Sequence, residues 1–128
     1  MKLLLDTHLL IWAASGSGLL PKSASELITD PANEVIFSSI SIWEVAIKRG
    51  LERPDFDVEP RVLRRGLLDY GYGELAFTSD HAFAVSSLPL LHKDPFDRAL
   101  MAQAMSEGLV LLTSDKVLEA YSGIVRKV

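Results

Sequence analysis

Short apolar runs alternate with amphipathic stretches along the whole chain. A short apolar run rich in β-branched or aromatic residues is typical of a buried strand, and apolar residues spaced three or four apart indicate a helix. The predicted strands cover residues 2–5, 34–38, 74–77, 109–112 and 123–128. The predicted helices cover residues 7–14, 21–30, 39–49, 61–70, 79–88 and 94–107. This alternation predicts a single α/β domain over residues 1–128, with a mostly parallel sheet covered by helices on both faces.

The helix over residues 39–49 has the clearest end signals. Ser39 or Ser41 is expected to cap its start, and Gly50 is expected to end it. The two prolines and several charges of residues 51–60 then predict a loop.

The composition is that of an ordinary folded domain, with 48% hydrophobic and 23% charged residues in a chain of 128. Seventeen acids outnumber thirteen bases, giving a net charge of −4. This balance excludes a simple basic coat for nucleic acid, but it does not exclude an enzyme whose acids hold metal ions. The absence of cysteine excludes disulfides, thiolate zinc sites, iron–sulfur clusters and a cysteine nucleophile.

Asp6 and His8 interrupt the apolar start of the chain, and the apolar run that follows them is short. A secretory signal or a membrane span needs a longer uninterrupted run. We therefore expect a cytoplasmic protein with no membrane contact.

Acidic side chains follow several of the predicted strands. Asp6 comes directly after the first strand, Asp115 follows the strand at 109–112, and Glu44 lies one turn into the helix after the second strand. Asp97 lies in the first turn of the helix at 94–107. Ligands of parallel sheets bind beyond the carboxyl ends of the strands, so these acids are expected to meet there. Clustered carboxylates repel one another unless a cation joins them, and Mg²⁺ or Mn²⁺ prefers oxygen ligands.

Each of these acids also has a purely structural explanation, because Asp is common at helix N-termini. The cap explanation is favoured for Asp94, which precedes a proline at the first helical position. Glu44 is harder to explain in this way. It lies beside a predicted apolar helix face formed by Ile42, Val45 and Ala46, where an unpaired carboxylate would be costly.

At these residues the sequence resembles the PIN-domain ribonucleases, and in particular the VapC-type toxins of toxin–antitoxin pairs. The resemblance covers the whole chain, in the order of the family. The segments that carry it are LLLDTHLLIW at 3–12, SSISIWEVAIKRG at 38–50, HKDPFDRALMAQA at 92–104 and LLTSD at 111–115. It implies an α/β/α sandwich and a metal-dependent endoribonuclease with an acidic pocket.

The resemblance also implies roles for individual residues. The family's acids, as catalytic residues and metal ligands, match Asp6, Glu44, Asp97 and Asp115. The second acid lies in an S-x-x-E-x-x-x-K pattern, and the fourth lies in a T-x-D motif. The implied cofactor is Mg²⁺, with Mn²⁺ as the alternative ion. The implied partners are an RNA substrate, a VapB-type antitoxin and a second copy of the chain in a homodimer.

Further polar residues are candidates for supporting roles. The hydroxyls of Thr7 and Thr113 could orient a carboxylate or form local turn hydrogen bonds. Lys48 could pair with Glu44 at i, i+4 or contact phosphate. Arg98 points to another side of its helix, where an ion pair is the favoured reading and contact with phosphate is the alternative.

Several other residues are open to two readings, and we favour the structural one. His8 and His92 lack zinc-type spacing, so packing or loop roles are favoured over metal binding. For Trp12 and Trp43, core or dimer packing is favoured over base stacking. The most basic stretch is expected to be a solvated face, with an RNA-guiding rim as the alternative; it comprises Lys48, Arg49, Arg53, Arg61, Arg64 and Arg65.

The predicted function is hydrolysis of RNA phosphodiester bonds with Mg²⁺ held by the four acids. A response-regulator receiver fits poorly, because Asp6 ends the first strand alone. An aspartyl-phosphate phosphatase fits poorly because His8 stands where a second Asp is needed. The remaining alternative is a non-catalytic PIN-like module that binds RNA or protein. Without the four pocket acids, thirteen acids face thirteen bases, so the rest of the chain is neutral.

Overall fold

The computed structural model describes residues 1–90, 93–121 and 123–128, and His92 lies outside them. Five strands form one sheet in the order β3-β2-β1-β4-β5, and all the pairings are parallel. The strands are β1 (Lys2–Leu5), β2 (Glu34–Ser38), β3 (Gly73–Leu75), β4 (Val110–Thr113) and β5 (Val125–Lys127). The predicted α/β class is confirmed, and the sheet is wholly rather than mostly parallel.

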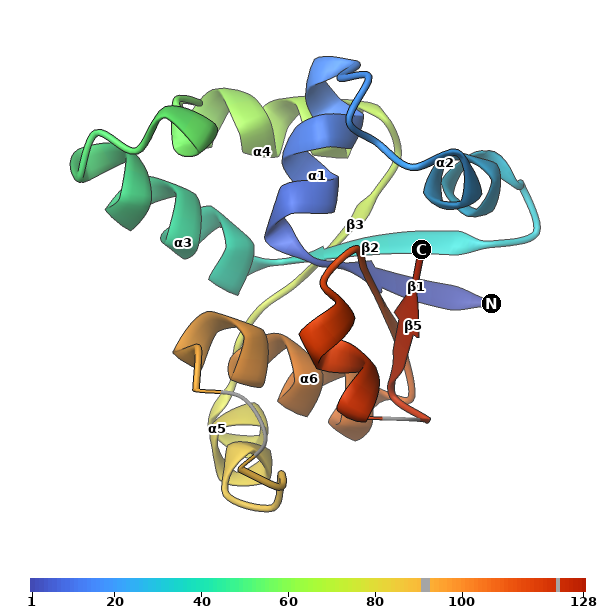
Figure 1. The fold of residues 1–128 in the computed structure, drawn as a ribbon, viewed down its shortest axis with the longest axis vertical. Coiled ribbons are helices and arrows are strands. Elements are labelled where there is room, and N and C mark those ends of the chain that lie inside the picture. The colour runs from blue at the N-terminus through green and yellow to red at the C-terminus, as the bar shows by residue number, and fades with distance from the viewer. Residues whose placement is uncertain (91–92, 122) are drawn as a thin grey trace.

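Six α-helices and two 3₁₀ turns connect the strands in the described residues. The helices are α1 (Thr7–Ser15), α2 (Lys22–Thr29), α3 (Ser39–Gly50), α4 (Pro60–Asp69), α5 (Ser79–Val85) and α6 (Pro95–Glu107). The 3₁₀ turns are η1 (Pro54–Phe56) and η2 (Lys116–Ala120). Figure 1 shows α1, α2 and α4 on one side of the sheet and α5 and α6 on the other.

The sheet separates two hydrophobic cores because side chains along a strand alternate between its faces. In β1, Leu3 and Leu5 enter the core beneath α1 and α4, while Leu4 enters the core beneath α6. All three leucines are fully buried. In β4, Leu111 and Leu112 divide between the two cores in the same way. This alternation fixes the strand register and so the position of Asp6 at the end of β1.

Two details of the helices differ from the sequence prediction. Ser38, the last residue of β2, caps α3 by accepting a hydrogen bond from the Ile40 amide at 3.0 Å. Neither Ser39 nor Ser41 is the cap, because the strand runs directly into the helix and the capping position falls one residue earlier. The predicted apolar face of α3 is also partly wrong, since Ala46 is exposed.

The predicted helix at 79–88 is shorter in the structure. α5 ends at Val85, and the chain continues to Leu88 in tight turns closed by i→i+3 hydrogen bonds. Two serines and then Pro89 follow, and this composition disfavours a longer α-helix. No described helix is long and apolar enough to cross a membrane.

Candidate active site

A pocket of about 200 Å³ opens at the carboxyl ends of β1 and β4, where α3 and α6 also begin. All four predicted acids line it, together with Asp94. The full lining comprises Asp6, Thr7, His8, Glu44, Lys48, Asp94, Asp97, Ser114 and Asp115. The fold therefore gathers acids that are distant in sequence at one edge of the sheet.

Asp6 is buried at the end of β1, with 6% of its surface exposed. It caps α1, because its Oδ1 accepts a hydrogen bond from the Leu9 amide at 2.9 Å. Its Oδ2 accepts a hydrogen bond from the Thr113 hydroxyl at 2.5 Å. Burial raises the pKa of Asp6 above its ordinary value, and these two hydrogen bonds oppose the rise. The carboxylate is thus held in one orientation at an electrostatic cost.

Thr113 joins the ends of two strands. Its hydroxyl donates to Asp6 and also accepts a hydrogen bond from the Asp115 amide at 2.9 Å. Both sequence readings of Thr113, a carboxylate-orienting hydroxyl and a local turn bond, therefore describe part of what it does.

Glu44 is 4% exposed, although it lies on a helix surface. The Thr7 hydroxyl donates to its Oε1 at 2.6 Å, and Lys48 Nζ donates to its Oε2 at 2.6 Å. The Ser41 hydroxyl lies 3.0 Å from that of Thr7. The predicted i, i+4 pair of Glu44 and Lys48 is thus present, and it is a pocket contact rather than a surface one.

Three acids on the remaining walls stand at helix starts. Asp94 Oδ1 accepts hydrogen bonds from the amides of Phe96 at 2.8 Å and Asp97 at 3.2 Å. Asp115 Oδ1 accepts one from the Val117 amide at 2.9 Å and so begins η2. Asp97 lies in the first turn of α6. Asp94 therefore caps its helix, as favoured, and lines the pocket as well.

The chemistry of the lining fits a hard divalent cation, since carboxylate and hydroxyl oxygens dominate it. The present side-chain orientations, however, do not form a finished metal site. Among the described residues, no group of three His, Asp or Glu side chains is arranged to hold a metal ion. Hydrogen bonds within the protein hold Asp6 and Glu44 in their present orientations.

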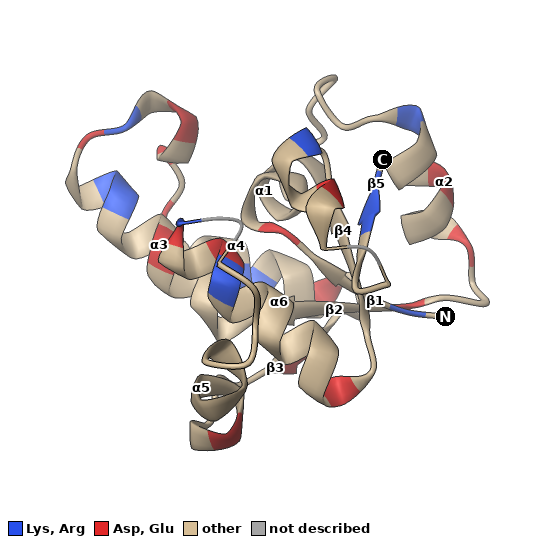
Figure 2. Cartoon of the chain, turned by 60° about the horizontal axis from the view of Figure 1, so that its bottom comes forward, with Lys and Arg blue, Asp and Glu red and all other residues tan. Residues whose placement is uncertain are grey.

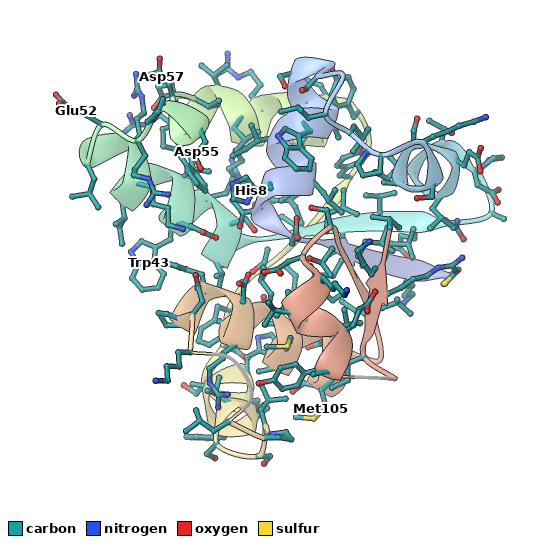
Figure 3. The ribbon with its side chains drawn as sticks, viewed as in Figure 1. His8, Trp43, Glu52, Asp55, Asp57 and Met105 are labelled. Atoms are coloured by element: carbon teal, nitrogen blue, oxygen red, sulfur yellow. The ribbon has the colours of Figure 1, made fainter. Side chains whose placement is uncertain are left out.

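Arg98, a predicted supporting residue, and His8, for which a packing or loop role was favoured, both make contacts within the protein. Arg98 donates to the carbonyls of Pro89 at 3.1 Å and Val85 at 3.2 Å, so these contacts tie it to the end of α5. His8 lines the pocket, and its Nε2 lies 3.3 Å from Asp55 Oδ2. Figure 3 shows His8 and Asp55 turned toward one another.

The predicted basic stretch is dispersed rather than gathered into one rim. Lys48 is in the acidic pocket, while Arg49 and Arg53 line a separate open groove of about 730 Å³ at the end of α3. Arg64 Nη2 pairs with Glu74 at 2.8 Å. The loop after α3 is mostly acidic, with Arg53 as the single base among Glu52, Asp55 and Asp57 (Figure 2).

Sequence reasoning missed the aromatic side chains around Lys48. Phe56 from η1 and Phe96 from α6 flank Lys48, and Trp43 packs edge-on against Phe96 with centroids 4.9 Å apart. Trp43 is 54% exposed, so it is not a core residue, whereas Trp12 packs against the core beneath α1. Ser114 was also missed. No local pattern marks Phe56, because its place depends on tertiary packing.

Comparison with known proteins identifies the family. The profile described as PIN domain matches residues 3–124. Among curated proteins, none matches the chain. A chain of VapBC2 from Rickettsia felis, solved with promoter DNA, has a TM-score of 0.67 at 17% identity, covering 99% of this chain and 98% of that one.

Two further solved structures are similar. VapBC-1 from nontypeable Haemophilus influenzae has a TM-score of 0.66 at 18% identity, covering 99% of this chain and 98% of that one. A toxin–antitoxin complex from Klebsiella pneumoniae has a TM-score of 0.63 at 22% identity, covering 96% and 94%. At these identities the likeness concerns the fold. The family profile, which spans nearly the whole chain, shows that the protein belongs to the PIN domain family.

Proposed function

We propose that this PIN domain is a metal-dependent endoribonuclease and the toxin of a type II toxin–antitoxin pair. The observation that carries the proposal is the meeting of Asp6, Glu44, Asp97 and Asp115 in one pocket. Four elements of a parallel α/β fold contribute these acids, at the sheet edge where such folds bind ligands. An acidic lining of this kind is suited to divalent ions and unsuited to a bare anionic substrate.

The four acids are the proposed ligands of Mg²⁺, and Mn²⁺ also suits oxygen donors. A bound divalent ion would lower the pKa of a water molecule and stabilise negative charge on the phosphate. The protein's hydroxyls keep the carboxylates oriented, Thr113 on Asp6 and Thr7 on Glu44. Glu44 is the proposed acceptor of the proton of the attacking water, because each of its oxygens keeps a further lone pair.

The substrate is proposed to be RNA, in keeping with the family resemblance and with the charge distribution. Apart from the four pocket acids the chain carries equal numbers of acids and bases. Neutralising the pocket with metal would therefore remove the net repulsion from phosphate.

The proposed partners follow from the similar structures, several of which are VapBC complexes. We propose a VapB-type antitoxin for this chain and a homodimer as its basic unit, acting in the cytoplasm. Trp43 is a candidate for the dimer contact, since more than half of its surface is exposed.

The test is cleavage of a mixed RNA pool by the full chain in Mg²⁺ and in EDTA. We expect wild-type cleavage in Mg²⁺ only, and loss of cleavage in Asp6→Asn. Asp80→Asn is the matched control, because Asp80 is exposed at the start of α5 and does not line the pocket. Full activity of Asp6→Asn, or of the wild type in EDTA, would contradict the proposal. RNA binding without cleavage in any metal would favour the non-catalytic module.

A further inference from the structure

Lys48 lies within the acidic pocket and is held there by three elements. Its Nζ donates to Glu44 Oε2 at 2.6 Å, and its side chain is 18% exposed. The same nitrogen lies 4.8 Å from the centre of the Phe56 ring and 5.6 Å from that of Phe96. Aromatic faces attract an ammonium group, so η1 and α6 both stabilise the position that α3 supplies.

The charge of Lys48 matters because Glu44 is buried. The side chain of this glutamate is 6% exposed, and besides Lys48 the neutral hydroxyl of Thr7 donates to its carboxylate. A buried carboxylate without a counter-charge is costly. Within the described lining of the pocket, Lys48 is the single Lys or Arg side chain.

We propose that Lys48 is a built-in counter-cation of the pocket, which holds Glu44 when no metal is bound and opposes the binding of a divalent ion. This inference rests on the proposed function as a metal-dependent nuclease. An ammonium and a divalent cation attracted to the same carboxylate repel each other strongly in a partly buried site. Lys48 therefore lowers the affinity of the pocket for metal while it stabilises the protein without metal.

A purely orienting role for Lys48 predicts the opposite change in metal affinity. If Lys48 only placed Glu44 correctly for an ion, its removal would weaken metal binding. If Lys48 competes with the ion, its removal strengthens metal binding. The sign of the change thus separates the two roles without any measurement of cleavage.

The experiment is calorimetric titration of the full chain with Mn²⁺, after treatment with EDTA and its removal. We expect Lys48→Met to bind Mn²⁺ at least about tenfold more tightly than the wild type. Lys48→Arg, which keeps the charge, is expected to bind nearly as the wild type does. Lys22→Met is the matched control, since Lys22 is exposed on α2. Thermal unfolding in EDTA is expected at a lower temperature for Lys48→Met than for either control.

Each outcome supports or overturns the proposal. If Lys48→Met does not fold, Lys48→Gln takes its place, because glutamine keeps a donor for Glu44 without the charge. Equal or weaker Mn²⁺ binding by the neutral variant overturns the counter-cation proposal and leaves the nuclease proposal intact. Absence of Mn²⁺ binding by both the wild type and the neutral variant overturns the nuclease proposal itself, and the two failures are therefore distinguishable.

Discussion

The hydroxyl of Thr113 can be removed with little change of shape by the substitution Thr113→Val. Thr113 is fully buried, and its hydroxyl donates to the carboxylate of Asp6. Valine keeps the volume and suits a strand, so no cavity forms. The variant therefore isolates one charged hydrogen bond at the centre of the site.

The expected loss of stability can be worked from the two bonds. A hydrogen bond to a charged group contributes about 1.5–3 kcal/mol, and the exposed Asp115 adds little because water can replace the acceptor of its amide. The free energy of unfolding should thus fall by about 2–3 kcal/mol, or roughly 8–12 °C in Tm for a domain of this size. In an Asp6→Asn background the bond is neutral, and the same change should cost only about 0.5–1.5 kcal/mol.

The wild type, Thr113→Val, Asp6→Asn and the double variant form a double-mutant cycle. Urea unfolding followed by tryptophan fluorescence, in EDTA at about pH 7.5, measures the free energy of unfolding of each. Thr113→Ser is the control, since it keeps the hydroxyl and loses only a methyl group. The cost of Thr113→Val should shrink as the pH falls through the pKa of Asp6, because a protonated Asp6 no longer needs the donor. A loss below about 0.5 kcal/mol, or an equal loss in both backgrounds, would refute the assigned role of this bond.

Three further predictions concern stability. In EDTA near neutral pH, Asp6→Asn should melt at a higher temperature than the wild type, because burial raises the pKa of Asp6 and disfavours its ionised form. In melting curves recorded over a pH series, this difference in melting temperature should fade as the pH falls through that pKa. Gly108→Ala should lower the free energy of unfolding by about 1 kcal/mol, because φ is +66° there. Gly66→Ala should raise the free energy of unfolding by about 0.5–1 kcal/mol, because Gly66 lies in the middle of α4 with open space around it. Urea unfolding that shows stabilisation by Gly108→Ala or destabilisation by Gly66→Ala would contradict this. Gln103→Leu removes the buried acceptor of the Ser38 hydroxyl and should cost about 1–3 kcal/mol by the same assay, and an unchanged midpoint would count against this network.

The strands were the most predictable part of the fold. β1 and β2 match their predicted bounds because unbroken apolar runs are needed where a strand is buried on both faces. The placement of α5 was less accurate, since residues 86–88 form tight turns closed by i→i+3 hydrogen bonds where a continued helix was predicted. The Ser38 cap was missed because Ser38 is both the last residue of β2 and the cap of α3.

The candidate site was predictable as far as strand order determines it. Asp6 and Asp115 follow adjacent parallel strands, so their meeting was implied by the topology. The surroundings of Lys48 were not predictable, because Phe56 reaches it from a loop with no local signal. The hydrogen bonds from Arg98 to the carbonyls of Val85 and Pro89 were not predictable either, because they depend on how the end of α5 packs against α6.

The pocket acids are also structural members of the elements that they begin. Asp6, Asp94 and Asp115 cap α1, α6 and η2, and each accepts a hydrogen bond from at least one backbone amide of the first turn. An alanine scan of the pocket would therefore remove a helix cap together with a candidate ligand, and lost activity would be mixed with lost structure. Asparagine keeps the capping oxygen and removes the charge, so it separates the loss of a charged ligand from the loss of a helix cap.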